Sequence, residues 1–128
     1  MARVFKSAWF VRFSRKEKIA DHQLLDVAHR VKDGMADVEL GGGVFKQRLT
    51  RPGRGKSGGF RVIILFRAGK SIFFVYCFAK KDLANLRSSE VEMFKKMASH
   101  LFALSDEQLD ALIANGQFQE VLENDEKI

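Results

Sequence analysis

Apolar and polar positions along the chain follow two spacings, which predict both strands and helices. Short runs rich in β-branched and aromatic residues are typical of strands, and apolar residues at intervals of three or four are typical of helices. The expected elements are a strand at 6–13, a helix at 15–33, strands at 44–49, 60–66 and 72–79, two helices within 88–116, and a short strand at 118–122. This order predicts a single α+β domain over residues 1–128, with helices on one face of a mainly antiparallel sheet.

Short motifs indicate where the helices begin and end. Three pairs have the spacing of a capping box, in which a Ser and a Glu or Gln bind each other's backbone N–H groups: Ser14 and Glu17, Ser89 and Glu92, and Ser105 and Gln108. Gly34 and Gly116 follow the last apolar positions of two predicted helices, where glycine suits the C-terminus.

The three central strands are expected to form an antiparallel meander. Alternation along 44–49 places two sets of side chains on opposite faces, namely Phe45, Gln47 and Leu49 against Val44, Lys46 and Arg48. Segment 72–79 is almost continuously apolar, which favours the centre of the sheet with both faces covered. The glycines at 41–43 are expected to be a flexible break, and segment 50–59 is expected to be a loop.

Charge is distributed unevenly along the chain. The net charge is +6, but residues 41–81 alone carry +10 and contain no Asp or Glu, whereas residues 1–40 carry +2 and residues 82–128 carry −6. The densest part, FKQRLTRPGRGKSGGFR at 45–61, holds six Lys or Arg and four Gly. Because like charges repel, this pattern indicates a polyanionic partner, most commonly nucleic acid. A basic face that only aids solubility is the alternative.

Other chemistries lack the residue patterns that they need. Gly55-Lys56-Ser57 is similar to the end of a phosphate-binding P-loop, but Thr50 stands where that motif has Gly, and a strand follows instead of a helix. The three His are scattered, and Cys77 lies within an apolar strand. We therefore expect no metal, no cofactor and no Ser- or Cys-based nucleophile.

The sequence gives no sign of secretion or of membrane insertion. The N-terminal segment MARVFKSAWFVRF alternates apolar and basic residues and lacks the continuous apolar stretch of a signal peptide. No apolar run approaches the length of a membrane span. A single Cys cannot form an internal disulfide, so a reducing cytoplasm is the expected location.

Basic side chains from neighbouring strands are expected to meet on one surface. Lys46 and Arg48 share a strand face, Arg61 opens the next strand, and Lys81 follows the strand after that. Further candidates for binding a polyanion are Arg51, Arg54, Lys56, Lys80 and Arg87. A phosphodiester held among such cations would account for the crowding, and its binding would depend strongly on salt.

These segments resemble the RelE/HigB group of the RelE/ParE toxin superfamily. The likeness covers roughly residues 5–102 and is carried by FKQRL, by KSGGFRVIILF and by IFFVYCFAKKD. It implies a bacterial toxin with a RelE-like fold, extended here by two C-terminal helices. It further implies that the toxin enters the ribosomal A site, cuts the messenger RNA there, and is neutralised by an antitoxin.

The resemblance also makes Lys46, Arg48, Arg61 and Lys81 the candidate catalytic residues, and it makes RNA the polyanion that the further candidates would bind. RelE has a Lys-x-Lys pair on the strand before the loop, matched by Lys46 and Arg48, and an Arg at the start of the next strand, matched by Arg61. The basic pair after the following strand is matched by Lys80 and Lys81. RelE has a tyrosine shortly beyond that pair. Arg87 stands there in this chain, so the role of that tyrosine is missing or is supplied by another group.

The implied reaction is attack of the RNA's own 2′-hydroxyl, which leaves a cyclic phosphate and a free 5′-hydroxyl. Lys46 could act as the base only if cations such as Arg48 and Arg61 favour its neutral form. Arg48 and Arg61 would stabilise the transition-state charge, and Lys81 could assist the leaving group. The ribosome would position the substrate, so that free RNA would be cut slowly.

Two other functions fit parts of the pattern. A ParE-type toxin shares the fold and poisons DNA gyrase, but it lacks most of this basic set. A non-catalytic module that binds RNA or DNA explains the charge and needs no chemistry. For the toxin, the expected partner is an antitoxin of helix-turn-helix type that covers the basic face, with DNA bound only through the complex.

Overall fold

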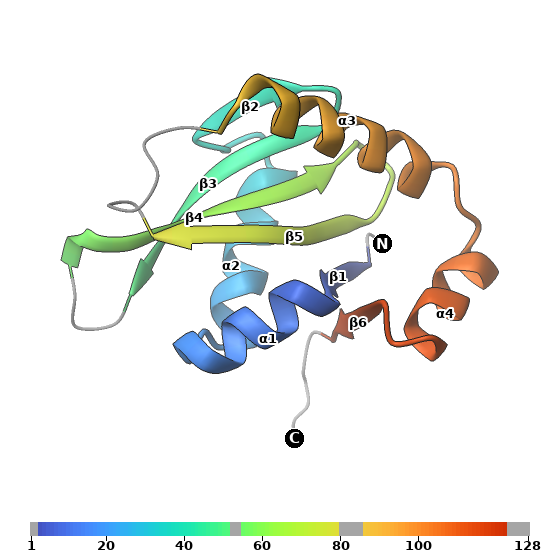
Figure 1. The fold of residues 1–128 in the computed structure, drawn as a ribbon, viewed down its shortest axis with the longest axis horizontal. Coiled ribbons are helices and arrows are strands. Elements are labelled where there is room, and N and C mark those ends of the chain that lie inside the picture. Colours follow the sequence, from blue (N-terminus) through green and yellow to red (C-terminus); the bar gives the residue numbers. More distant parts are fainter. Residues whose placement is uncertain (1–2, 52–54, 80–85, 123–128) are drawn as a thin grey trace.

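The computed structural model describes residues 3–51, 55–79 and 86–122, which form a six-stranded sheet with four helices (Figure 1). The elements in chain order are β1 (Val4–Ser7), α1 (Ala8–Glu17), α2 (Asp21–Lys32), β2 (Val38–Gly41), β3 (Val44–Arg51), β4 (Gly55–Phe66), β5 (Ile72–Ala79), α3 (Ser88–Phe102), α4 (Asp106–Ala114) and β6 (Phe118–Val121). The α+β class and the mainly antiparallel sheet are therefore confirmed.

The sheet has the strand order β2-β3-β4-β5-β1-β6. The pairs β2–β3, β3–β4 and β4–β5 are antiparallel, which confirms the predicted meander. β1 lies beside β5 and runs parallel to it, and β6 closes the sheet antiparallel to β1. The predicted strand at 118–122 is confirmed as β6, whereas β2 was not predicted.

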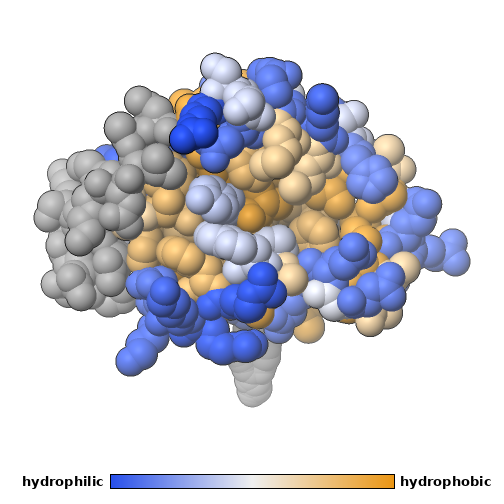
Figure 2. Space-filling model, viewed as in Figure 1, coloured by the Kyte–Doolittle hydropathy of each residue, from blue (hydrophilic) through white to orange (hydrophobic). Residues whose placement is uncertain are grey.

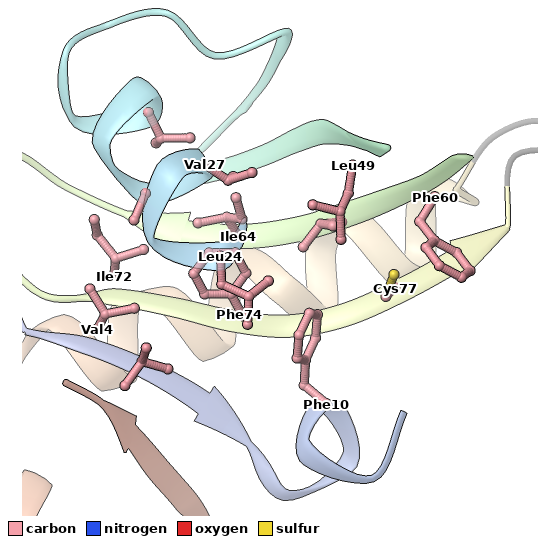
Figure 3. Close-up of a cluster of buried hydrophobic side chains, with 14 residues drawn as sticks. Val4, Phe10, Leu24, Val27, Leu49, Phe60, Ile64, Ile72, Phe74 and Cys77 are labelled. Carbon is pink, nitrogen blue, oxygen red and sulfur yellow. The ribbon is translucent and has the colours of Figure 1, made fainter. Parts of the chain in front are cut away.

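Helices cover both faces of the sheet, and the prediction of helices on one face is wrong. One core lies under α1 and α2, where Phe10, Leu24 and Val27 contact strand residues that include Ile64 and Phe74 (Figure 3). The other core lies under α3 and α4 and contains Phe94, Ala98 and Leu109. Two layers of helices are needed because β4 and β5 present apolar side chains on both faces.

The predicted helix at 15–33 is confirmed over residues 21–32 as α2, but its predicted start and the predicted strand at 6–13 are wrong. β1 ends at Ser7, whose hydroxyl oxygen accepts a hydrogen bond from the Phe10 N–H at 3.1 Å and caps α1. Lys18 ends α1 in the left-handed conformation with φ of 58°, and α2 begins only at Asp21. Ser14 is buried inside α1 and donates to the Val11 carbonyl, so the predicted capping box with Glu17 does not form.

The C-terminal helices were predicted more accurately. Ser105 and Gln108 form the predicted capping box of α4, with hydrogen bonds of 3.2 and 2.8 Å. The box predicted at Ser89 and Glu92 is wrong, because the N-cap of α3 is Arg87, two residues earlier, and the Glu90 carboxylate accepts from the Arg87 N–H. Arg3 anchors this end of the chain through ion pairs with Glu120, Asp106 and Asp110.

Two predicted irregular segments are more regular than expected. β3 runs to Arg51 and β4 begins at Gly55, so most of the predicted loop at 50–59 is strand. The glycines at 41–43 form the tight β2–β3 turn, and all three have positive φ. No helix in the described ranges combines the length and apolar character needed to span a membrane.

Gly43 offers a test of this packing. Its φ is +82°, and an added Cβ would lie 2.8 Å from the Phe102 ring and 3.0 Å from the Phe66 carbonyl oxygen. Gly34 has a similar φ of +80° with no atom within 4 Å of an added Cβ. We expect Gly34→Ala to lower the free energy of unfolding by about 1 kcal/mol from backbone strain, and Gly43→Ala by roughly 1–3 kcal/mol more from overpacking. Urea unfolding followed by circular dichroism measures both, and equal losses would contradict the described contact of the β2–β3 turn with α3.

Candidate nucleic-acid interface

The pairing of β3 with β4 gathers three cations on one face of the sheet. Lys46 and Arg48 alternate onto the same face of β3, and Arg61 on β4 lies directly opposite Arg48. This is the face covered by α3, because Ile63, the partner of Lys46, belongs to the core under that helix. The predicted alternation along 44–49 is confirmed, with Leu49 in the opposite core.

The three cations line one pocket together with two residues from the edge of the sheet. Asp37 and Val38 complete its lining, and its volume is about 380 Å³. Lys46 and Arg61 are half-buried, while the Arg48 side chain is 65% exposed. We call this set, Asp37, Val38, Lys46, Arg48 and Arg61, the basic pocket.

Asp37 is the acidic member of the basic pocket, and three hydrogen bonds hold it. Its own N–H donates to Gln47 Oε1 at 2.8 Å, and its Oδ2 accepts from the Arg48 N–H at 2.8 Å and from Arg48 Nε at 3.2 Å. Burial acts to raise the pKa of Asp37, but the hydrogen bonds and the charge of Arg48 outweigh burial and lower this pKa below its usual value. Asp37 is therefore an anion at neutral pH.

The sequence pattern did not reveal Asp37, because it lies outside the acid-free block 41–81. The register of β2 with β3, in which Val38 pairs with Lys46, carries Asp37 back beside Arg48. Since β2 itself was not predicted, nothing in the local sequence connected these two residues.

An aromatic group lies next to the cations on the same face. β5 bulges opposite Ile63 and Ile64, which shifts its alternation so that Tyr76 pairs with Ile63 and Phe78 pairs with Arg61. The Tyr76 ring lies 4.7 Å from the ring of Trp9 and 6.1 Å from that of Phe94, measured between ring centroids. Figure 2 shows the resulting apolar area over β5, with hydrophilic residues along α1 and α3 on either side.

The remaining candidates lie elsewhere or outside the described residues. Of the four predicted catalytic cations, the structure brings together Lys46, Arg48 and Arg61, while Lys81 lies outside the described residues. The same holds for Lys80 and Arg54, and for the side chains of Arg51 and Lys56. Arg87 is exposed and precedes the first turn of α3.

The His and Cys side chains are the remaining candidates for metal binding and for nucleophilic chemistry. No three His, Cys, Asp or Glu side chains among these residues could hold a metal ion together. Cys77 is buried in the core under α1 and α2, and burial raises the pKa of its thiol, which keeps it protonated. The position of Cys77 therefore fits a role in core packing.

Two guanidinium groups and an ammonium on one sheet face match the chemistry of a phosphodiester. Arginine presents its donors in a planar fork that suits phosphate oxygens, and lysine adds a compact charge. The neighbouring aromatic rings suit the apolar faces of bases. The arrangement is therefore chemically suited to a single-stranded nucleic acid.

Comparison with family models finds a match over nearly the whole chain. A family model described as the RelE toxin of RelE / RelB toxin-antitoxin system matches residues 2–121, which include the whole basic pocket and both C-terminal helices. No curated protein sequence matches the chain significantly.

The basic pocket predicts how nucleic-acid binding responds to salt. We expect Arg61→Gln to weaken binding of a short single-stranded RNA several-fold and to reduce the slope of log affinity against log salt by about 0.7, because one phosphate contact is lost. The matched control is Lys70→Gln, which removes an exposed cation from the β4–β5 turn outside the pocket. Fluorescence anisotropy over a salt series measures both slopes. Equal changes in the two variants would mean that only net charge matters.

Proposed function

The chain belongs to the RelE toxin family of toxin–antitoxin systems, and we propose that it is a ribosome-dependent endoribonuclease that cuts messenger RNA in the A site. The observation that carries the proposal is the convergence of Lys46, Arg48 and Arg61 on one sheet face. Such a set suits a transition state that carries two negative charges on phosphorus oxygens.

The proposed reaction needs no group beyond the side chains and the RNA. The 2′-oxygen attacks the adjacent phosphorus while its proton passes to Lys46, which can accept it only in its neutral form, and the bond from phosphorus to the 5′-oxygen breaks. The products are a 2′,3′-cyclic phosphate and a 5′-hydroxyl, whose proton Lys81 would supply. Arg48 and Arg61 would hold the non-bridging oxygens in a fixed geometry.

In the proposed mechanism, the ribosome aligns the substrate. The usual proton carriers in enzymes are His and carboxylates, but the basic pocket has no His and its one carboxylate, Asp37, is bound to Arg48. A site of this kind depends on a substrate that arrives already aligned, with its 2′-hydroxyl in line with the scissile bond. The ribosomal A site would provide that alignment, so free RNA would be a poor substrate.

The family also implies an antitoxin partner. We propose a helix-turn-helix antitoxin that covers the basic pocket, with the complex rather than the toxin alone contacting DNA. Its surface over the pocket would be acidic, since the three cations need compensation when they lose contact with water. Toxin and ribosome would then meet in the cytoplasm once the antitoxin is gone.

The first test follows messenger cleavage in a cell-free translation reaction with mapped RNA ends. We expect the wild-type chain to cut within codons at the A site, and Arg61→Ala to lose at least about 100-fold of this activity, because a transition-state contact is removed. Growth inhibition on induction should disappear in parallel, while the thermal unfolding midpoint stays within a few degrees. An Arg61→Ala chain that remains fully toxic would exclude Arg61 from the site. Gyrase inhibition without cut messenger would favour the ParE-type alternative.

The second test separates chemistry from binding at Lys46. If Lys46 takes the proton, Lys46→Ala should reduce single-turnover cleavage far more than it reduces co-sedimentation with ribosomes. Lys46→Arg is the matched control, because it keeps the charge but cannot give up its proton at neutral pH. Equal loss of cleavage and of ribosome binding in Lys46→Ala, with full activity in Lys46→Arg, would make Lys46 a binding residue only.

A further inference from the structure

Asp37 stands at the point where the ladder between β2 and β3 ends. Val38, the first residue of β2, pairs with Lys46 on β3. Arg48 lies two residues further along β3, so its N–H lies beyond the last pair of this ladder. The Asp37 carboxylate accepts from that N–H at 2.8 Å and takes the place of a strand partner. A backbone donor near the sheet edge is thereby satisfied by a side chain.

Asp37 is held from both faces of β3. Gln47 and Arg48 are adjacent on β3 and point to opposite faces. Gln47, only 1% exposed, accepts from the Asp37 N–H, while Arg48 donates twice to the Asp37 carboxylate. The carboxylate therefore has a fixed position in the basic pocket, although its side chain is 27% exposed.

The Arg48 guanidinium is restrained at one of its three nitrogens. Nε donates to Asp37 at 3.2 Å, and within the described residues the Nη atoms have no hydrogen-bond partner. Because the guanidinium is planar and rigid, fixing Nε also fixes the direction of both Nη groups. A 65% exposed arginine without this contact would sample many rotamers and would lose that freedom on binding.

We propose that Asp37 is a positioning residue, which orients Arg48 so that its Nη groups face an RNA phosphate in the basic pocket. The inference rests on the proposed function in that it takes RNA as the ligand. An acidic residue would then favour the binding of an anion, because Arg48 loses its rotamer freedom to the contact with Asp37 before the phosphate binds. As an ion pair alone, the contact would add little to stability, since Arg48 is largely exposed.

Two simpler roles for Asp37 make different predictions. An anion that only repels RNA would weaken binding, and its removal in any form would strengthen it. A residue that only completes the β3 backbone would act through the Arg48 N–H, which any side chain at position 48 retains. Only the positioning role requires the guanidinium itself.

The test compares Asp37→Ala with Asp37→Asn, each with Arg48 and in an Arg48→Ala background. Both substitutions remove the charge, but Asn keeps an oxygen that can accept from Arg48. Binding of a short fluorescent oligouridine is measured by anisotropy at low salt, with unfolding midpoints for every variant. Glu39→Ala is the matched control for loss of one acid, because Glu39 on β2 pairs with Phe45 and lies outside the basic pocket.

With Arg48 present, we expect the Asp37→Ala chain to bind about fivefold more weakly than the Asp37→Asn chain. In the Arg48→Ala background, the two should bind alike. A ratio that persists without Arg48 would show a backbone role, and a ratio of one in both backgrounds would show simple repulsion. Either result, or a wild-type chain that does not bind the oligouridine, overturns the proposal. Absence of messenger cleavage with the fivefold ratio intact would overturn the nuclease function alone.

Discussion

The register between β3 and β4 is the constraint on which the site depends. It places Arg48 opposite Arg61, an arrangement of like charges that is unfavourable by itself. The two cores maintain it, because Val62 and Ile64 are buried on one face while Ile63 and Leu65 are buried on the other. A slip of one residue would exchange the buried side chains of both faces. The hydrophobic energy of two core layers therefore holds cations together that would otherwise separate.

Asp37, at the edge of the sheet, partly offsets the repulsion among the three cations. Asp37 provides one negative charge beside the three cations and binds Arg48 through its side chain and its backbone. The basic pocket nevertheless keeps an excess of positive charge. That excess would attract an RNA phosphate, and it would equally attract the acidic antitoxin surface proposed above.

The aromatic side of the site depends on how the sheet is interrupted. β1 ends at Ser7, and α1 then covers the edge of β5 that β1 leaves unpaired, so that Trp9 lies against Tyr76. The bulge in β5 brings Tyr76 to the face of the cations. Strict alternation along 72–79 would have placed Tyr76 with Phe74 in the opposite core. A bulge leaves no clear mark in a continuously apolar segment, which explains why sequence reading could not place this residue.

Much of the molecule could be predicted from short-range patterns. The apolar runs of β4 and β5, the alternation along β3 and the Ser105–Gln108 cap each depend on residues close in sequence, and they are present as predicted. The RelE family was indicated by three short segments and is confirmed, whereas the polyanionic partner indicated by charge stays a prediction. The error at the N-terminus has a local cause, since a short apolar run such as the one within 6–13 suits a helix as well as a strand. Tertiary structure alone decided that helices cover both faces, that β1 runs parallel to β5, and that Asp37 enters the basic pocket. Each of these depends on contacts between residues far apart in sequence or in separate elements, whose energies no local pattern contains.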